Sequence, residues 1–99
     1  MILEAAILNV RPGQEAAFES AIRAAKPLIA ATPGFVDIDV QRCLERPSHY
    51  LLLVRWETLE DHTVGFRQSE RYQEWRKALH HFYDPFPVVE HYGESVFAA

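Results

Sequence analysis

The residues best suited to chemistry lie where an apolar segment meets a polar one, in the stretch YLLLVRWETLEDHTVGF from Tyr50 to Phe66. Trp56 closes the apolar segment, and His62 follows shortly after it. Imidazole titrates near neutral pH, so His62 is the natural proton acceptor of this region. The alternative is a partly buried histidine that only orders the turn. We place a candidate active site at this junction, with His62 as its candidate catalytic base.

A second group of candidates follows on an aromatic face. Tyr72, Trp75, Leu79 and Phe82 recur at the spacing of one helix face. Arg76 is one position away from this stripe, so it can reach an anionic or carbonyl oxygen at the edge of the same face. By spacing alone, a solvated helix charge is the simpler interpretation of Arg76. Aromatic bulk likewise favours a core position over a ligand-binding one for each ring.

The pattern of histidines and cysteine does not indicate a metal site. Ligation needs several donors that converge on one point, and the chain has no His-x-x-x-His pair and no cysteine near a histidine cluster. We expect His81 and His91 to be solvated, and Cys43 to be an inert thiol. Nucleophile elbows, glycine-rich phosphate loops, CxxC pairs and Rossmann fingerprints are also absent from the sequence. An aromatic pocket with one base suits an activated organic substrate better than hydrolysis or phosphoryl transfer.

Composition places these residues in one small globular domain, residues 1–99. An apolar fraction of 48% argues against disorder. The formal net charge of -4 disfavours nucleic acid as a partner, because phosphate neutralisation needs a basic patch. No segment has the length of a membrane span or the pattern of a signal peptide. The single cysteine fits a reducing compartment, so we expect a cytoplasmic protein without a membrane partner.

The first half of the chain predicts strand, helix and strand. Residues 2–10 are apolar on both faces, which is typical of a strand buried on both sides. From about Gln14, apolar residues at helical spacing predict a helix whose buried stripe is Phe18, Ile22, Ala25 and Ile29. Pro27 should kink this helix or end its regular part near Lys26. Gly34 suits a left-handed turn, after which residues 36–41 alternate as a half-buried strand does.

The second half predicts strand, short helix, helix and strand. Residues 49–56 form the third strand, antiparallel to the second through a short turn. Thr58 is a suitable N-cap for a short helix over residues 59–66, and Asp61 makes a weaker form of the capping box. Ser69 caps the next helix, Pro85 and Pro87 end it, and residues 88–96 form the last strand.

The order β-α-β-β-α-β predicts an α+β, ferredoxin-like fold with a four-stranded antiparallel sheet. Two helices can cover only one face of this sheet, yet the first and third strands are apolar on both faces. We therefore expect a homodimer in which two sheets pack face to face. The alternative is that the extra apolar residues lie at strand ends or under loops.

With these elements in place, the chain resembles the antibiotic biosynthesis monooxygenase (ABM) family of dimeric α+β barrels. The resemblance is carried by VRPG at residues 10–13, TPGF at 32–35, YLLLVRWETLEDHTVGFRQS at 50–69 and YQEWRKALHHFYDPFPVVEHY at 72–92. It implies a dimeric α+β barrel and oxygenation without a flavin or a metal. In such enzymes an aromatic substrate is deprotonated, and the resulting anion itself reacts with dioxygen.

The resemblance also implies roles for particular residues. Trp56, His62 and Arg76 match the positions that line the pocket of polyketide-oxidising members, with His62 as base and Arg76 as anion stabiliser. A pocket asparagine of those members falls at Leu52, which is a departure in this sequence. The substrate-binding residues expected around His62 and Arg76 are Trp56, Phe66, Tyr72 and His80.

The function expected is therefore that of a cofactor-independent monooxygenase oxidising a small, aromatic organic substrate with dioxygen. One alternative is a haem-degrading monooxygenase of the same superfamily, which is disfavoured because Ala6 and Arg76 stand where those enzymes use asparagine and histidine. His80 would then be the first candidate for the iron ligand. The other alternative is a non-catalytic dimeric module that binds a small apolar ligand.

Overall fold

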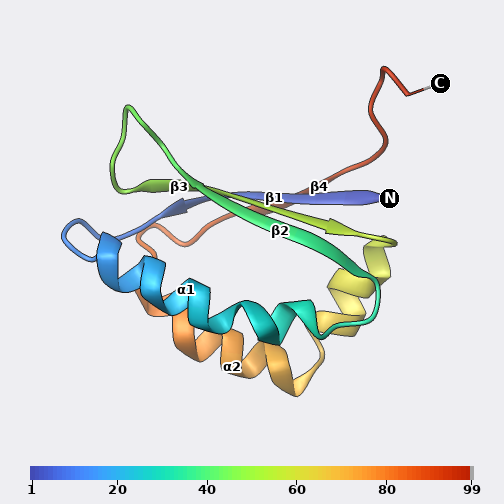
Figure 1. The fold of residues 1–99 in the computed structure, drawn as a ribbon, viewed down its shortest axis with the longest axis horizontal. Helices are drawn as coiled ribbons and strands as arrows, with labels where there is room; N and C mark the ends of the chain where they lie inside the picture. Colours follow the sequence, from blue (N-terminus) through green and yellow to red (C-terminus); the bar gives the residue numbers. More distant parts are fainter. Residues whose placement is uncertain (99) are drawn as a thin grey trace.

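The computed structural model describes residues 1–98 and gives the element order that the sequence predicts. Figure 1 shows one sheet with the two long helices beneath it. Two short turns of helix, η1 of the π type and η2 of the 3-10 type, flank the second long helix. The elements are β1 (Ile2–Asn9), α1 (Glu15–Ala30), β2 (Phe35–Arg42), β3 (His49–Trp56), η1 (Asp61–Phe66), α2 (Glu70–Leu79), η2 (His80–Phe82) and β4 (Val89–Tyr92).

The sheet has the strand order β2-β3-β1-β4, and every neighbouring pair is antiparallel. Central strands β1 and β3 pair along their whole length, from Ile2 opposite Trp56 to Asn9 opposite His49. Strand β4 pairs with β1 over four residues only, with Ala6 opposite Val89 and Leu3 opposite Tyr92. It is therefore shorter than the predicted strand over residues 88–96. The ferredoxin-like α+β fold predicted from the element order is confirmed.

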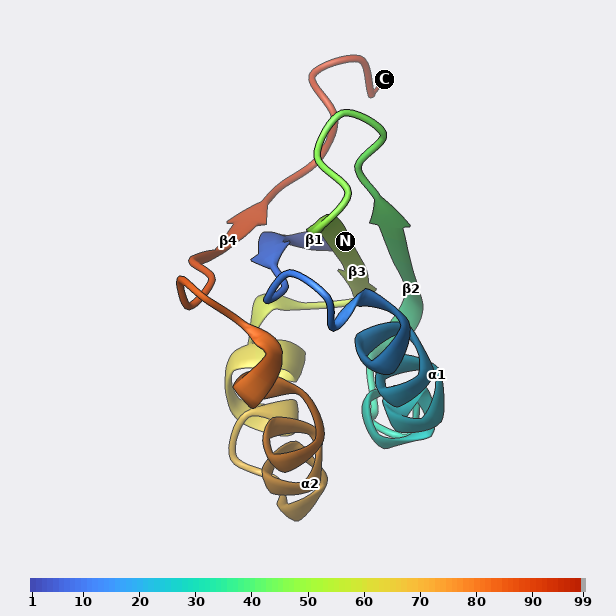
Figure 2. The ribbon, with the colours of Figure 1, turned by 90° about the vertical axis from the view of Figure 1, so that its left-hand side faces the viewer.

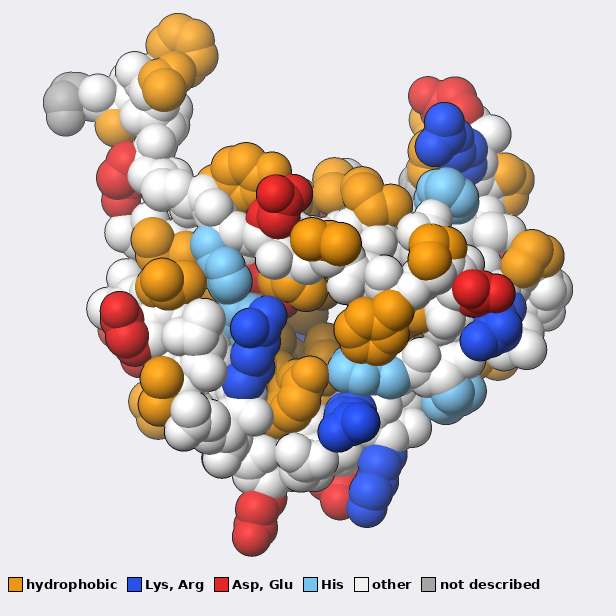
Figure 3. Space-filling model, turned by 180° about the vertical axis from the view of Figure 1, so that it is seen from behind, with side chains coloured by type: hydrophobic (Ala, Val, Ile, Leu, Met, Phe, Trp, Pro, Cys, Tyr) orange, Lys and Arg blue, Asp and Glu red, His pale blue; other side chains and the backbone are white. Residues whose placement is uncertain are grey.

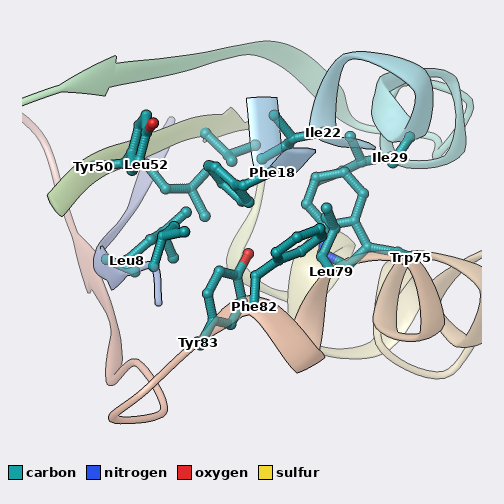
Figure 4. Packing of buried hydrophobic residues seen from close by; sticks show 14 of the residues in the cluster. Leu8, Phe18, Ile22, Ile29, Tyr50, Leu52, Trp75, Leu79, Phe82 and Tyr83 are labelled. Carbon is teal, nitrogen blue, oxygen red and sulfur yellow. The ribbon is translucent and has the colours of Figure 1, made fainter. Parts of the chain in front are cut away.

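Both long helices cover the same face of the sheet (Figure 2). Their apolar stripes agree with the spacing in the sequence, because α1 buries Phe18, Ile22, Ala25 and Ile29. Phe18 lies at the centre of the core, where its ring centroid is 4.9 Å from that of Tyr50. Figure 4 shows side chains of the sheet, α1 and the α2–η2 segment meeting around this ring. The described residues thus form one continuous core.

Of the two outcomes expected for Pro27, a kink in α1 and an end of its regular part near Lys26, the second does not occur. The helix continues through Pro27 to Ala30. Pro27 removes one backbone hydrogen bond, but the last turn buries Ile29, which is only 1% exposed. Burying such a side chain contributes roughly 1.5–3 kcal/mol, which offsets a lost backbone hydrogen bond.

The junction between β3 and η1 has the capping box predicted for Thr58 and Asp61. The Thr58 N–H donates to Asp61 Oδ2 at 3.1 Å, and the Asp61 N–H donates to Thr58 Oγ1 at 3.2 Å. Gly34 has φ +88° and lies directly against this box, so that a Cβ at Gly34 would overlap the Asp61 carboxylate. The turn after α1 and the start of η1 are therefore held together.

The other face of the sheet carries apolar side chains that no helix covers. Along β1 the core-facing residues alternate with residues of this open face, among which Ile7 is 50% exposed. Tyr92 of β4 is 53% exposed. The chain after β4 and the β2–β3 connection both project on the open side of the sheet (Figure 2). The two-sided apolarity of the central strands is thus real in the folded chain.

Candidate functional site

A cavity of about 380 Å³ lies between the sheet and the α2–η2 segment. Figure 3 shows it as a hollow with hydrophobic side chains inside and basic and histidine side chains around its rim. The residues that line it are Glu4, Leu8, Ile29, Leu52, His62, Phe66, Arg67, Tyr72, Trp75, His80, Tyr83, Phe86, Pro87 and Val89. Its wall is mostly aromatic and aliphatic, with polar groups concentrated in a few side chains. Such cavities are typical of sites for small organic molecules.

Aromatic rings form much of the cavity wall. Phe66 makes edge-to-face contacts with Tyr72 at 5.4 Å and with Trp75 at 5.8 Å. His80 lies 4.9 Å from Phe86 and 6.0 Å from Tyr83 between ring centroids. These arrangements are the ones that aromatic pairs prefer, and they give the cavity a rigid, apolar wall.

One wall of the cavity holds a buried carboxylate. Glu4 lies on the core-facing side of β1, in line with Ala6 and Leu8, and is only 4% exposed. Its Oε1 accepts a hydrogen bond from Trp56 Nε1 at 2.9 Å. A buried carboxylate is costly unless it is hydrogen-bonded or protonated, so this position needs a partner. The Trp56 indole supplies one.

His62 provides the second contact of Glu4. The Nε2 atom of His62 lies 3.3 Å from Glu4 Oε1, and its ring stacks on Trp56 at 5.3 Å between centroids. On the opposite side of the ring, Nδ1 lies 2.8 Å from Nε2 of His91, on the strand β4 that pairs with β1. His91 is the register partner of Glu4. Glu4, His62 and His91 therefore form a continuous row of polar contacts, which we call the acid–imidazole row.

Burial sets the protonation of the row. It raises the pKa of Glu4 to about 7, against the opposing effects of the Trp56 hydrogen bond and the Arg67 charge. Burial also lowers the pKa of His62 to about 3, with further lowering by Arg67 and by His91. The pKa of His91 is likewise lowered, mainly by burial and then by Arg67. Near neutral pH both imidazoles are neutral, so the 3.3 Å contact of His62 Nε2 with Glu4 Oε1 is not an ion pair.

Arg67 brings the positive charge nearest to this row. It directly follows η1, lines the cavity and remains exposed to solvent. It forms no salt bridge within residues 1–98. Its guanidinium is therefore available to an anionic group of a bound molecule.

The structure brings together four of the six residues that the sequence proposed for the site. His62, Phe66, Tyr72 and His80 all line the cavity. Trp56 is fully buried behind His62 and Phe66 and does not line the cavity, although it hydrogen-bonds to Glu4. Arg76 is exposed on α2 and does not line the cavity either. Its charge lowers the pKa of His80, although burial of His80 has the larger effect.

Sequence reasoning missed Glu4 and Arg67, and it was wrong about His91, which is half-buried rather than solvated. Glu4 did leave a signal, because it is a charged residue at a core-facing position of an apolar strand. His91 gave none by itself, since its inward direction depends on how β4 pairs with β1. The expectations of solvent exposure for His81 and Arg76 agree with the structure.

Among residues 1–98, no helix is long and apolar enough to cross a membrane. The same residues contain no group of three or more His, Cys, Asp or Glu side chains arranged to hold a metal ion.

Comparison with known proteins gives the family. The sequence pattern described as antibiotic biosynthesis monooxygenase matches residues 1–78. The protein YczJ of Bacillus subtilis (strain 168) is 52% identical over 94 residues, which cover 95% of this chain and 99% of YczJ. A Bordetella bronchiseptica protein, whose name assigns it to the antibiotic biosynthesis monooxygenases, is 39% identical with a TM-score of 0.90, covering 96% of this chain and 97% of its own.

A more distant structure has the same fold. SnoaB of Streptomyces nogalater, named as a cofactor-independent oxygenase, is 18% identical and has a TM-score of 0.74, with 99% of this chain and 94% of that chain covered. The pattern match covers β1, α1, the β3–η1 junction and α2 as far as residue 78, and the two closer relatives cover 95% and 96% of this chain. The chain therefore belongs to the antibiotic biosynthesis monooxygenase family.

Proposed function

We propose that this protein is a cofactor-independent monooxygenase that oxidises a small, aromatic organic substrate with dioxygen. The observation that carries the proposal is the cavity itself, with an aromatic wall and a proton-accepting acid–imidazole row. Membership of the family supports the reaction class, and the name of SnoaB supports the absence of a cofactor. Fold alone does not fix a reaction, so the chemistry rests on the cavity.

The reaction needs a substrate with an acidic C–H group. A base in the cavity removes one proton, and the resulting electron-rich anion transfers electrons to dioxygen. When a methylene group becomes a carbonyl, one oxygen atom enters the product and the other leaves as water, so no external reductant is required. An apolar wall favours this step because it keeps water away from the reactive anion.

Residue roles follow from position in the cavity. His62 belongs to the proton-accepting group, and Phe66, Tyr72 and His80 form the wall against which the substrate packs. Trp56 supports the site from behind by fixing Glu4 and His62. For the developing negative charge, Arg67 is the better placed guanidinium, and Arg76 would act from outside the lining. A preorganised positive charge of this kind stabilises an anionic transition state.

We also propose that the active form is a homodimer. The open face of the sheet exposes Ile7 and Tyr92, and the segment after β4 exposes Val96 and Phe97, each 93% exposed. Exposed apolar surface of this extent favours association, and a second copy offers a matching apolar face. In the dimer the two sheets would pack against each other with the helices outside.

Anthrone is a suitable probe substrate, because its methylene is acidic and its oxidation by dioxygen gives anthraquinone and water. We expect the purified protein, with a metal chelator present and no added flavin, to consume one dioxygen per anthraquinone formed. Binding without oxygen consumption would instead support the small-ligand module. A haem complex with a shifted Soret band that turns over with a reductant would support haem degradation through His80, which does line the cavity.

A further inference from the structure

We propose that Glu4 is the residue that takes the proton from the substrate, and that His62 and His91 conduct this proton from the buried carboxylate to solvent. The inference rests on the proposed function and assigns the proton path within the same cavity. It replaces a single histidine base by a row of three groups on three elements, β1, η1 and β4.

The geometry of His62 leaves it no nitrogen for a substrate. Its Nε2 faces Glu4 Oε1 at 3.3 Å, and its Nδ1 faces His91 Nε2 at 2.8 Å. A general base must approach the proton it removes with a free lone pair in the plane of its ring. Each ring nitrogen of His62 thus has a protein group close to it, so this ring is placed to pass a proton along the row and not to collect one from the cavity.

Glu4 does have a free acceptor atom. Trp56 Nε1 and His62 Nε2 both approach Oε1, and no hydrogen bond within residues 1–98 reaches Oε2. Among the buried side-chain nitrogen and oxygen atoms of these residues, only Arg71 Nε is without a partner. Oε2 therefore is not sealed by protein atoms, and because Glu4 lines the cavity, this oxygen is open to a bound molecule.

The proton path balances, because every group that accepts a proton also releases one. The substrate C–H loses its proton to Glu4, and Glu4 gives a proton from its carboxyl to His62 Nε2. His62 then releases the proton on Nδ1 to Nε2 of His91, and His91 releases one to solvent from its own Nδ1. His91 is half-buried at the edge strand β4, so it is the point where the row meets water. One proton is taken up, one is released, and Glu4 returns to its ionised form. Both imidazoles start with the proton on Nδ1 and end with it on Nε2, so they return to the first tautomer by proton exchange with solvent before the next turnover.

The charges around Glu4 suit a base that works near neutral pH. The groups that face it are His62 from η1, His91 from β4 and Arg67 just after η1, and on β3 its neighbours are the uncharged Val54 and Trp56. Burial raises the pKa of Glu4 to about 7. Proton transfer is most efficient when the pKa of the base lies near the working pH. The rate should accordingly rise with pH through about 7.

Hydrogen–deuterium exchange of anthrone without dioxygen isolates the proton step from the oxygenation. We expect the wild-type protein to accelerate exchange of the methylene hydrogens in anaerobic deuterium oxide, followed by proton NMR. Glu4→Gln keeps an oxygen for the Trp56 hydrogen bond but cannot take a proton. It should lower the exchange rate by about 10²–10⁴-fold, while the affinity for the product anthraquinone stays unchanged.

Two further variants test the path and keep the experiment decisive. His91→Gln should slow exchange with solvent less than Glu4→Gln does, whereas the matched change His81→Gln, at an exposed histidine outside the cavity lining, should leave it unchanged. If Glu4→Gln does not fold, Glu4→Asp retains a carboxylate further from the substrate and should lower the rate while keeping a rise with pH. If Glu4→Gln exchanges the methylene hydrogens as fast as the wild-type protein does, the inference is overturned.

The failure of the proposed function would look different. Wild-type protein that exchanges the methylene hydrogens through Glu4 but consumes no dioxygen would refute the monooxygenase and leave the proton path standing. Wild-type protein that accelerates neither reaction would refute both.

Discussion

Glu4 and His62 show how burial can set opposite protonation preferences in two touching side chains. Removing each group from water disfavours its charged form, so the pKa of the acid rises and that of the base falls. The Trp56 indole keeps Glu4 in place whether or not it carries a proton, because it donates to Oε1 while Oε2 stays open. At the residue scale, the site therefore combines the Glu4 carboxyl, which titrates near pH 7, with the His62 imidazole, which is neutral at that pH.

The raised pKa of Glu4 predicts a stability difference that depends on pH. A carboxyl with a pKa of about 7 when folded, against 4.5 when unfolded, contributes its full stability below pH 4.5 and loses it as pH rises through 7. Glu4→Gln lacks this loss. The free energy of unfolding of Glu4→Gln minus that of the wild type should increase by roughly 3 kcal/mol between about pH 5 and pH 8. Urea denaturation at each pH measures this difference. The opposite effect of His62, which costs stability below pH 6.5, is present in both proteins. A difference that is constant with pH would mean that Glu4 titrates normally in the fold.

The two arginines near the cavity make a matched pair for the anion-stabilising role. Arg67 lines the cavity and Arg76 does not. If Arg67 stabilises the developing anion, Arg67→Gln should lower the anthrone oxidation rate by roughly tenfold to a hundredfold, less than a buried oxyanion donor because the side chain is exposed. Arg76→Gln should have the smaller effect, and the loss in Arg67→Gln should shrink at high salt. The reverse ranking would support the role that the sequence predicted for Arg76.

At the scale of elements, the site depends on how η1 begins. The reciprocal bonds between Thr58 and Asp61 fix the first turn after β3, and this turn carries His62 onto the Trp56 ring. Gly34 packs against the same carboxylate, and the Glu57 N–H donates to the Gly34 carbonyl at 2.8 Å. The turn after α1 therefore supports the junction that positions His62 in the acid–imidazole row.

A comparison of two glycines tests this support. Gly34 and Gly13 both have φ +88°, so an alanine is strained at either position. Only at Gly34 does the new Cβ meet other atoms, those of Asp61. Gly34→Ala should lower the free energy of unfolding by roughly 2–4 kcal/mol, from the backbone strain and the damaged cap together. Gly13→Ala should cost only about 1 kcal/mol, from the strained φ angle. Equal losses in urea denaturation would show that the contact with Asp61 carries no energy.

At the scale of the whole molecule, the sheet divides the chain into a filled side and an open side. The filled side contains the core, the cavity and both helices, while no helix covers the open side, where the β2–β3 connection and the segment after β4 project (Figure 2). A stable dimer interface formed from such a face should be large and apolar, like a core cut in half. The proposed dimer would remove the exposed apolar surface without disturbing the cavity on the other side.

Two substitutions of equally exposed side chains test the dimer. Ile7 on the open face and Val64 in η1 are each 50% exposed. Ile7→Glu would place charges inside the proposed interface, where they lose their hydration, so it should shift the protein towards monomer at micromolar concentration in sedimentation velocity. Val64→Glu should leave the dimer intact. A wild-type monomer under these conditions, or equal behaviour of the two variants, would contradict sheet-to-sheet packing.

The sequence by itself determined what depends on neighbouring residues along the chain. Helical spacing predicted the buried stripe of α1, alternation predicted β2, and the Thr58 and Asp61 spacing predicted the capping box. Each of these patterns follows from the repeat of one element or one turn, so a single sequence carries it. The placement of His62 just inside the helix after Trp56 followed in the same way, and in the structure His62 lines the cavity.

Only the tertiary structure decided which of these residues meet. Glu4, His62 and His91 come together because β1 pairs with β4 and because η1 folds back under the sheet, and no local pattern encodes those contacts. Arg67 lines the cavity and Arg76 does not, which depends on how η1 and α2 pack against the sheet. Pro27 within α1 is a third case, since burial of Ile29 overrides the local cost of the proline. The physical reason is common to all three: local preferences are weak against the burial free energy of the packed whole, and only the packed whole fixes register and rotation.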